Sequence, residues 1–504
     1  MCGIAGSVNW INPNQNDLTN IKKIIRHLGH RGPDFSSTLN FGTATLGHSR
    51  LAIIDLNKSA NQPMMDSSQR FVICFNGEIY NYRELKNQLE KRGVLFKTKS
   101  DTEVILESYK LWKEDCLKKF EGMFAFAIWD KKLEQLFIAR DRIGEKPLFY
   151  IPLQKNNFKT GIIFSSELRA LLKHSFVNFS LNKQGVWDFL SLNYTLGSSS
   201  IIDNVRKLEP AHYLIYSKNK NIEKKYWNLE NFFYEKKEFK SKKVALEEFN
   251  CLLDSKIKDQ QISDVPLGAF LSGGIDSSTV VSSMSKTKKQ KFSTFCIGFD
   301  EESYNEIPQS EYVAKYFNLN NFSKVISMNI KRDFIDILNK SSDEPLADTS
   351  ILPMFYLSKF AKNKVTVCLS GDGADELFIG YETYLANQIR EIFKIIPDNL
   401  MQAMSYISKF IPVSHKKVSF DYKLKQFLSG HSLKKEKAHY WWRIIFPEEM
   451  KLQLLDNDFN ENLLDPFHRF DKFFKDVKDC DFIDQVSYVD IKTWLVDNIL
   501  VKLD

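Results

Sequence analysis

The sequence lacks the cysteine patterns that bind metal ions or cross-link small secreted domains. Its seven cysteines are widely separated and odd in number, and they form no C-x-x-C pair or Cys/His cluster. They are Cys2, Cys74, Cys116, Cys251, Cys296, Cys368 and Cys480. A disulfide framework or a zinc site needs closely spaced, paired ligands. The sequence therefore predicts neither.

Long apolar runs and concentrated charge are also missing. No stretch approaches the roughly 20 apolar residues of a membrane span, and the opening MCGIAGSVNWINPNQ has neither the basic region nor the apolar core of a leader. We therefore expect a cytoplasmic protein without a membrane partner. Lys and Arg outnumber Asp and Glu by only 70 to 63, and the excess is dispersed. This balance favours small anionic substrates over nucleic acid, whose binders usually concentrate basic residues on one face.

What the chain does have is enough length for two cores. It has 504 residues, and a single core rarely extends past roughly 300 residues. The N-terminal part shows alternating, β-branched and aromatic segments, with two helical stretches of three- and four-residue periodicity between them, so it predicts an α+β layered domain over residues 1–214. The expected strands are 1–8, 44–56, 70–80, 123–130, 135–141 and 161–167, and the expected helices are 81–93 and 101–115.

The composition changes between residues 215 and 245, where Lys, Asn and Glu dominate and periodicity is weak. We interpret this stretch as a linker. Beyond it, in residues 246–504, apolar strands such as VPLGAFL, FSTFCIGF and KVTVCL alternate with helices. That alternation predicts a parallel, doubly wound α/β sheet.

A cysteine stands directly behind the initiator methionine. Removal of Met1 would place a free α-amino group on Cys2. A thiol is nucleophilic mainly as the thiolate, and a neutral amine can accept its proton. Cys2 is thus either an N-terminal nucleophile that carries its own base or simply a small residue that begins a strand.

Two Ser/Gly loops follow apolar strands in the second half. FLSGGIDSSTVV runs from a strand through glycines into a helix, a pattern that accommodates phosphate or pyrophosphate, although the G-x-x-x-x-G-K-[ST] motif is absent. CLSGDGADELFIGY adds Asp372, Asp375 and Glu376. Three carboxylates beside a phosphate site indicate Mg²⁺, because both kinds of oxygen are ligands for that ion.

Taken together, the motifs resemble the class II glutamine-hydrolysing asparagine synthetases over essentially the whole chain. The first half shows MCGIAG, HRGPD, LGHSRLAIIDL, QPM, FNGEIYNYREL, SDTEVIL, FEGMFAFAIWD, RDRIGEKPLFY and FSSELRALL in the order of that family's glutaminase domain. The second half shows LSGGIDSS, DEPLADTSILP, LSGDGADELFIGY and DNILVKLD. The resemblance implies a four-layer αββα Ntn-hydrolase domain followed by a PP-loop ATP pyrophosphatase-like domain.

For the first domain, the resemblance implies that Cys2 attacks the side-chain amide of glutamine after Met1 is removed. Asn76 and the N–H of Gly77 would form the oxyanion hole. Arg50 would bind the α-carboxylate of glutamine. The remaining glutamine-binding residues would be the ammonium ligands Glu78 and Asp101 and the backbone of Leu51, Ala52, Ile53 and Ile54.

For the second domain, the resemblance implies that ATP activates a carboxylate as an acyl-adenylate and releases pyrophosphate. Residues implied to bind pyrophosphate and Mg²⁺ are Ser272, Gly273, Gly274, Asp276 and Ser277, and Asp375 would join the metal site. Contacts to adenosine would come from Leu271, Ile297, Ser370 and Gly371. Asp372 would assist formation of the intermediate or deprotonation of ammonia, and Lys502 would neutralise the departing pyrophosphate, with Asp348 as a further candidate in the aspartate pocket.

The end of the sequence departs from this family. Its members usually continue after K-[VL]-D, whereas this chain stops at Asp504. We expect Lys502, two residues from that end, to be poorly held, because chain ends fray unless they are docked. Synthesis would then be weak while glutamine hydrolysis is intact.

Two classes of function stay open. The first is glutamine- and ATP-dependent amidation of aspartate, with a variant in which another carboxylate, for example in surface-polysaccharide or secondary metabolism, receives the ammonia. The second is a degenerate, glutaminase-only protein. The partners are small molecules in either case, and a homodimer is compatible with both.

Overall fold

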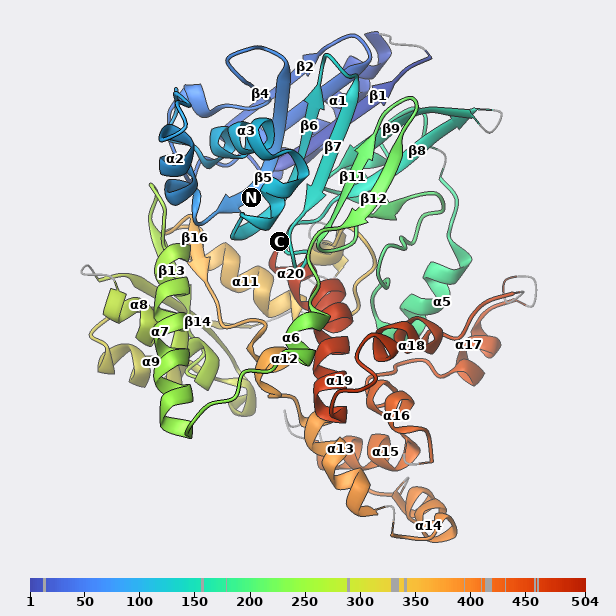
Figure 1. The fold of residues 1–504 in the computed structure, drawn as a ribbon. Coiled ribbons are helices and arrows are strands. Elements are labelled where there is room, and N and C mark those ends of the chain that lie inside the picture. Colours follow the sequence, from blue (N-terminus) through green and yellow to red (C-terminus); the bar gives the residue numbers. More distant parts are fainter. Residues whose placement is uncertain are drawn as a thin grey trace.

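The N-terminal half builds two antiparallel six-stranded sheets in the upper part of the molecule (Figure 1). The computed structural model describes residues 1–504 except 12–14, 156–157, 178, 288–290, 328–334, 340–341, 394, 409, 413–418, 431, 457–458 and 460–461. The first sheet, in spatial order, contains β10 (Arg206–Lys207), β8 (Phe149–Lys155), β9 (Phe158–Ser165), β1 (Gly3–Asn9), β3 (Ala44–Arg50) and β2 (Phe35–Asn40). The second contains β12 (Asn221–Lys225), β11 (His212–Tyr216), β7 (Gln135–Arg140), β6 (Gly122–Asp130), β5 (Phe71–Ile79) and β4 (Met64–Met65).

These sheets form the two inner layers of four. Side chains alternate along each strand: on β1, Ile4 and Val8 face the core between the sheets, whereas Ala5 packs against α1 (Gln15–His27). On the outer face of the second sheet lie α2 (Tyr82–Glu90) and α3 (Asp101–Trp112). The predicted αββα arrangement is therefore confirmed, and the two predicted helices are present.

The first half extends further along the chain than its predicted boundary. Strand β12 pairs with β11 inside the range 215–245, for which the sequence predicts a linker. The same range contains α6 (Glu230–Tyr234) and the start of α7 (Lys242–Gln260). Pairing with a neighbouring strand gives β12 its structure, although its own sequence has little periodicity.

The second half contains a four-stranded parallel sheet, as its alternating pattern predicts. Its order is β15 (Asn320–Ile326), β14 (Ser293–Phe299), β13 (Leu267–Phe270) and β16 (Val367–Leu369). Helices α7, α8 (Ile275–Thr287) and α9 (Ile307–Tyr316) contribute to the core on one face, and α11 (Ile351–Ala361) packs on the other. The sheet is doubly wound, and its winding direction reverses between β13 and β16.

Most of the remaining helices form the lower part of the molecule, and the last of them lies near its centre, beside the C-terminus (Figure 1). They are α12 (Ala374–Phe378), α13 (Glu382–Phe393), α14 (Asp398–Ser408), α15 (Phe420–Gly430), α16 (Lys435–Trp441), α17 (Glu448–Leu454), α18 (Phe467–Asp476) and α19 (Phe482–Asp490), then a π-helical segment (Ile491–Ile499) and α20 (Leu500–Leu503). No helix in the described ranges is both long and apolar enough to cross a bilayer.

A segment of the first half belongs spatially to this lower part. After α4 (Leu168–Leu171), the chain descends to α5 (Lys183–Leu192), which lies beside α17 and α18 (Figure 1). Leu192, Tyr194 and Leu196 are buried in the same core as α18 and α19. The two halves are thus interleaved, and a cut at residue 214 does not separate two independent cores.

Candidate active sites

Cys2 lies at the start of β1, beside the loop that follows β3. Its Sγ is 3.4 Å from the backbone N of Leu51 and 3.6 Å from the carbonyl oxygen of Leu51. Burial raises the pKa of this thiol, and it lowers the pKa of the neighbouring Met1 amine to about 6. Burial therefore disfavours the charged form of both groups, so the thiol is protonated and the Met1 amine is neutral near pH 7.

A small cavity of about 50 Å³ opens beside Cys2. Asn76, on β5, lines it, and both polar atoms of the buried Asn76 amide have no hydrogen-bond partner in the described part of the chain. Gly77 has φ +146°, and a Cβ there would lie 2.0 Å from the carbonyl oxygen of Met123. A donor that is buried without a partner is costly, so the Asn76 amide is arranged for a ligand.

Two buried carboxylates line the same cavity. Burial and, secondly, the charge of Asp101 raise the pKa of Glu78 to about 8, and one Glu78 oxygen has no partner among the described residues. Burial raises the pKa of Asp101 to about 6, although its Oδ2 accepts a hydrogen bond of 3.1 Å from the Ile79 N–H. A bound cation would lower both values and stabilise both charges.

Arg50 supplies the opposite charge. Its guanidinium donates to the Asn57 carbonyl at 3.0 Å and to Asn61 Oδ1 at 2.7 Å, with further donation to the carbonyls of Ile54 and Asp55. These contacts fix the planar group at the wall of the cavity. The cavity thus presents a nucleophile, an uncommitted amide and groups of both charges.

The structure brings together nearly all of the glutamine-site residues that the sequence predicts. Those that line the cavity are Cys2, Arg50, Leu51, Ile53, Ile54, Asn76, Gly77, Glu78 and Asp101. Ala52 does not line it, and its N–H instead bonds Asp34 at 2.8 Å. Sequence reasoning missed Gln62, whose amide bonds the Phe75 N–H at 2.6 Å and the Thr102 hydroxyl at 3.1 Å. The motif QPM contained the only signal for it.

The second site lies where parallel strands end. The loop after β13 begins at Leu271, and Ser272 Oγ lies 2.9 Å from Ser277 Oγ and accepts the Gly274 N–H at 3.2 Å. The loop after β16 carries Ser370 and Gly371. In doubly wound sheets, ligands bind at the carboxyl ends of strands, at the point where the winding direction reverses, and these two loops flank that point.

The two loops touch each other. A Cβ at Gly371 would lie 2.8 Å from the backbone N of Ser277 and 3.0 Å from the carbonyl carbon of Asp276. Gly273 has φ +81°, and a Cβ there would collide with Gln309. The glycines therefore allow a close backbone approach that the sequence could only suggest. Ile297, on the adjacent strand β14, is buried next to this region, as is Leu271.

The carboxylates of the second loop separate into two groups. Burial and the charges of Asp276 and Asp372 raise the pKa of Asp375, so these three side chains lie close to one another. Glu376 instead points away: it is fully buried and accepts a hydrogen bond from Tyr381 at 2.6 Å. The expectation that Glu376 contributes to a phosphate site is wrong. Glu376 and Asp375 are consecutive residues of the short helix α12, so their side chains point in different directions.

Lys502 is not loosely held. It lies on α20, its side chain is buried, and its ammonium donates to Asp348 Oδ2 at 2.6 Å and to the Ser350 hydroxyl. Burial opposes ionisation of Asp348, but Lys502 and the Ser350 bonds hold the pKa of Asp348 below its usual range. The expected fraying of this end is therefore contradicted. The structure does not place Lys502 in contact with the Ser272–Ser277 loop; it lines a separate, larger cavity.

That larger cavity, of about 720 Å³, lies between the two halves. It is lined by Met1 and Arg31 from the first half and by Asp343, Glu344 and Lys502 from the second. Met1 also lines the small cavity at Cys2. The methionine thus stands between the two spaces.

Comparison with known proteins defines the class and then the family. Residues 1–227 match the glutamine amidotransferase domain, and residues 248–504 match the asparagine synthase domain. The protein is therefore an amidotransferase that joins a glutamine amidotransferase domain to an asparagine synthase domain. It is 33% identical to asparagine synthetase (glutamine-hydrolyzing) 1 of Bacillus subtilis, over 100% of this chain and 77% of that one. It is 39% identical to the putative asparagine synthetase (glutamine-hydrolyzing) 2 of Methanocaldococcus jannaschii, over 79% of each chain. The chain belongs to the glutamine-hydrolysing asparagine synthetase family.

Proposed function

We propose that this protein hydrolyses glutamine to glutamate and ammonia, adenylates aspartate with ATP, and amidates it to asparagine with release of AMP and pyrophosphate. The observation that carries the proposal is the cavity at Cys2. It combines a protonated thiol, an unpartnered buried amide and two carboxylates with raised pKa values. Those groups complement the amide and the two charged ends of glutamine.

In the glutaminase step, removal of Met1 frees the amine of Cys2. That amine takes the thiol proton, and the thiolate attacks the carbon of the glutamine side-chain amide. Negative charge develops on the amide oxygen, where Asn76 Nδ2 and the Gly77 N–H can stabilise it. The amine returns its proton to the leaving ammonia, and water then hydrolyses the thioester. Burial lowers the pKa of the Met1 amine to about 6, and the same buried surroundings would favour the neutral, basic form of the Cys2 amine once Met1 is removed.

Recognition of glutamine would use both of its charged ends. Arg50 is held by backbone carbonyls at one wall and would bind the α-carboxylate, while Glu78 and Asp101 would bind the α-ammonium group. Charge-assisted bonds of this kind fix orientation as well as affinity. The backbone of residues 51–54 would complete the pocket, with Ala52 contributing less than the others because its N–H is engaged by Asp34.

In the synthetase step, the Ser272–Ser277 loop would hold the phosphates of ATP. Leu271, Ile297, Ser370 and Gly371 would contact the adenosine part, and Asp372 would assist the chemistry at the carboxylate. The loop leads into the N-terminus of α8, where the first backbone N–H groups of a helix have no intrahelical partner, and such a site favours phosphate.

The residues present fit a magnesium ion bound together with phosphate. The described residues contain no cluster of three or more His, Cys, Asp or Glu side chains suited to a metal on its own. Asp375, however, lies beside the carboxylates of Asp276 and Asp372, which raise its pKa. Asp276 and Asp375 would hold Mg²⁺, with phosphate oxygens completing its coordination. Such an ion compensates the charge of the phosphates.

The decisive experiment supplies the protein with glutamine, ATP, Mg²⁺ and aspartate and identifies AMP and asparagine among the products. We expect both, and we expect neither when Mg²⁺ is omitted. Replacement of aspartate by other carboxylates tests the acceptor. AMP formation only with a different carboxylate would contradict aspartate as the substrate.

Cys2→Ala separates the two sites. We expect this variant to lose glutamine-dependent synthesis and glutamine hydrolysis entirely, while synthesis from ammonium salts stays at the parental rate, because the PP-loop residues are untouched. The measurement is asparagine formation from each nitrogen source. Glutamine hydrolysis that survives in the variant would disprove the nucleophile assignment.

A further inference from the structure

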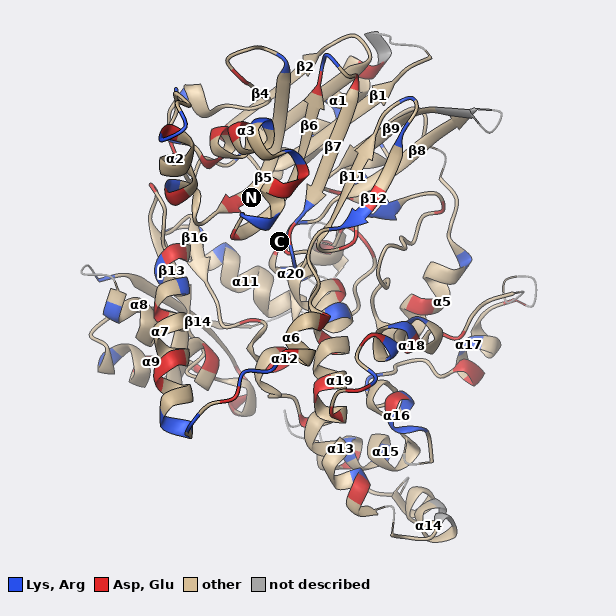
Figure 2. Ribbon diagram, viewed as in Figure 1, with Lys and Arg blue, Asp and Glu red and all other residues tan. Residues whose placement is uncertain are grey.

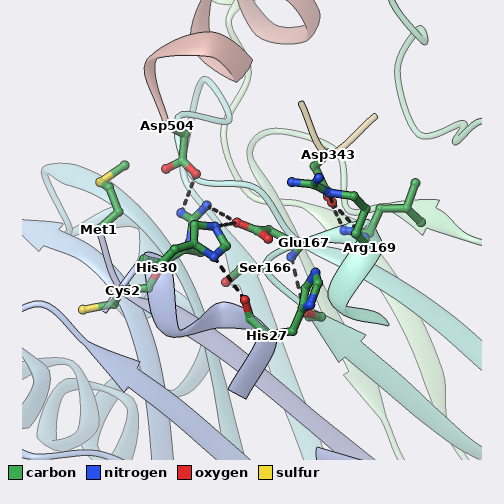
Figure 3. Close-up of polar contacts among 12 residues, drawn as sticks. Met1, Cys2, His27, His30, Ser166, Glu167, Arg169, Asp343 and Asp504 are labelled. Carbon is green, nitrogen blue, oxygen red and sulfur yellow. Dashed lines mark hydrogen bonds and ion pairs between the residues drawn. The ribbon is translucent and has the colours of Figure 1, made fainter. Parts of the chain in front are cut away.

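A chain of direct contacts runs from the last helix of the second half to the nucleophile in the first (Figure 3). Arg31 lies at its centre, just after α1. Its Nε donates to the Cys2 carbonyl at 2.9 Å, its Nη1 to Glu167 at 3.2 Å, and its Nη2 to Asp504. All three side-chain nitrogens of the guanidinium are thereby engaged.

The partner from the second half is a buried carboxylate. The Asp504 side chain is 5% exposed, and besides Arg31 it contacts Lys146 Nζ at 3.1 Å. Burial opposes the charge, but Arg31 and Lys146 hold the pKa of Asp504 below its usual range. Asp504 is therefore ionised at neutral pH, and its two cations come from the glutaminase half.

We propose that Asp504 is a positioning residue of the glutaminase site, which acts through Arg31 on the backbone of Cys2. The inference rests on the proposed function, since it concerns the same nucleophile. Asp504 lies in the half of the chain assigned to the synthetase, so the glutaminase site is complete only when α20 is docked.

The geometry explains how a carboxylate that never reaches glutamine would matter. A guanidinium is planar and rigid, so two carboxylates that bind Nη1 and Nη2 fix the direction of Nε. Nε in turn fixes the Cys2 carbonyl, and with it the orientation of the Cys2 residue. The thiol must point at the amide carbon beside Asn76, and small displacements of a reacting group are costly in rate.

The same helix is also held within the second half. Lys502, two residues before Asp504, bonds Asp348 at 2.6 Å. Helix α20 is therefore anchored at one side by a residue of the synthetase half and at the other by the glutaminase half.

Asp504→Asn tests the proposal, because it keeps the size of the side chain and removes its charge. We expect kcat/KM for glutamine hydrolysis to fall at least about tenfold, and the rate at which iodoacetamide alkylates Cys2 to change as well. Ammonia-dependent asparagine formation should stay within about twofold of the parent. Asp504→Glu, which retains the charge, should recover part of the lost hydrolysis.

A matched control breaks a different ion pair between the halves. Glu121, on the first half, pairs with Lys256 on α7, and their side chains are 43% and 46% exposed. Glu121→Gln should leave glutamine hydrolysis and Cys2 alkylation unchanged. A second variant, Arg31→Lys, keeps a cation beside Asp504 and Glu167 but removes the rigid link to Cys2, so it should reproduce the selective loss even if Asp504→Asn does not fold.

The outcomes distinguish this inference from the proposed function. If the Cys2→Ala variant still hydrolyses glutamine as the parent does, the proposed function is wrong. If hydrolysis depends on Cys2 but is the same in the parent, Asp504→Asn and Arg31→Lys, only the positioning role is overturned. Equal losses of hydrolysis and ammonia-dependent synthesis in Asp504→Asn would also overturn it, since they would indicate a general structural role.

Discussion

At the scale of single residues, the glutaminase cavity is defined by polar groups that the protein itself leaves unsatisfied. The Asn76 amide and one oxygen of Glu78 are buried without described partners. Burial of such groups without a partner raises the free energy of the folded state. A ligand with an amide oxygen and an ammonium group, such as the proposed substrate glutamine, would relieve that penalty, whereas an apolar molecule of the same size would not.

The raised pKa values of the two carboxylates make glutamine binding depend on pH. Glu78 has a pKa of about 8 and Asp101 a pKa of about 6, in each case chiefly because burial disfavours the charged form. The ammonium group of glutamine binds the charged form. The Kd of glutamine should therefore fall as the pH rises from 6 to 8, by up to about tenfold per unit below the pKa of Glu78, and then level off.

Calorimetry on the Cys2→Ala protein measures this Kd without turnover and without titration of the thiol. Glu78→Gln is the matched variant. It should bind glutamine more weakly, and its Kd should no longer change between pH 7 and 8. The change in Kd near pH 6, which is due to Asp101, should persist. A Kd that is constant from pH 6 to 8 in the Cys2→Ala protein would show that Glu78 does not bind the ammonium group.

At the scale of elements, the second site depends on two loops that approach each other at a glycine. They leave the sheet from β13 and β16, the strands that flank the reversal of winding. Acidic and basic positions are interspersed over the elements of both halves (Figure 2). Gly371 touches Asp276, and Asp375 follows it by four residues, so this contact lies between the two carboxylates that would hold Mg²⁺.

Gly371→Ala should therefore impair synthesis without affecting glutamine hydrolysis. The new Cβ would lie 2.8 Å from the Ser277 N, a contact that forces the loops apart. We expect the KM for ATP to rise and ammonia-dependent synthesis to fall about tenfold or more.

The control for that experiment is Gly29→Ala, where a Cβ meets no atom within 4 Å. Steady-state assays of AMP formation and of glutamate formation measure the two sites separately. Parental AMP formation by Gly371→Ala over a range of ATP concentrations would mean that the close approach of the loops is dispensable.

At the scale of the whole molecule, the halves are joined by more than a linker. Helix α5 leaves the N-terminal half and enters the helical part below. There the N–H of Ile445 bonds the Ser191 carbonyl at 3.1 Å, and Arg469 bonds the Leu196 carbonyl at 2.7 Å. Lys451 lies 3.6 Å from the centroid of the Trp187 ring. The large cavity between the halves is thereby enclosed by segments from both.

Leu196→Ala should destabilise the C-terminal half although the residue belongs to the N-terminal one. Leu196 is 1% exposed within the core that contains α18 and α19. Deletion of a buried leucine side chain typically costs ~2–5 kcal/mol. Urea unfolding followed by tryptophan fluorescence should report a loss of that size, since Trp494 packs against this core.

Leu181→Ala provides the comparison, because Leu181 comes from the same stretch of chain but is 53% exposed. Its free energy of unfolding should stay within about 0.5 kcal/mol of the parent. Equal effects of the two substitutions would indicate that residues 181–196 do not stabilise the lower helices.

The sequence by itself determined the two folds and the chemical groups of both sites. The signals for Cys2, for FNGE at 75–78 and for the two Ser/Gly loops are local, since a nucleophile behind Met1 or a glycine loop between strand and helix is visible within a few residues. The periodicity of the strands predicted a layered α+β domain, whereas the four αββα layers were implied by the family resemblance. These features need no knowledge of distant residues.

Only the tertiary structure decided which distant groups meet. Glu376 turns away from the loop after β16 and toward Tyr381. Asp504 pairs with Arg31, 473 positions away in the sequence, and α5 packs in the core of the other half. Contacts of this range leave no periodic signal, because each partner carries only an ordinary local pattern. The free energy of burying both partners together fixes such contacts, and that energy depends on the whole packed molecule.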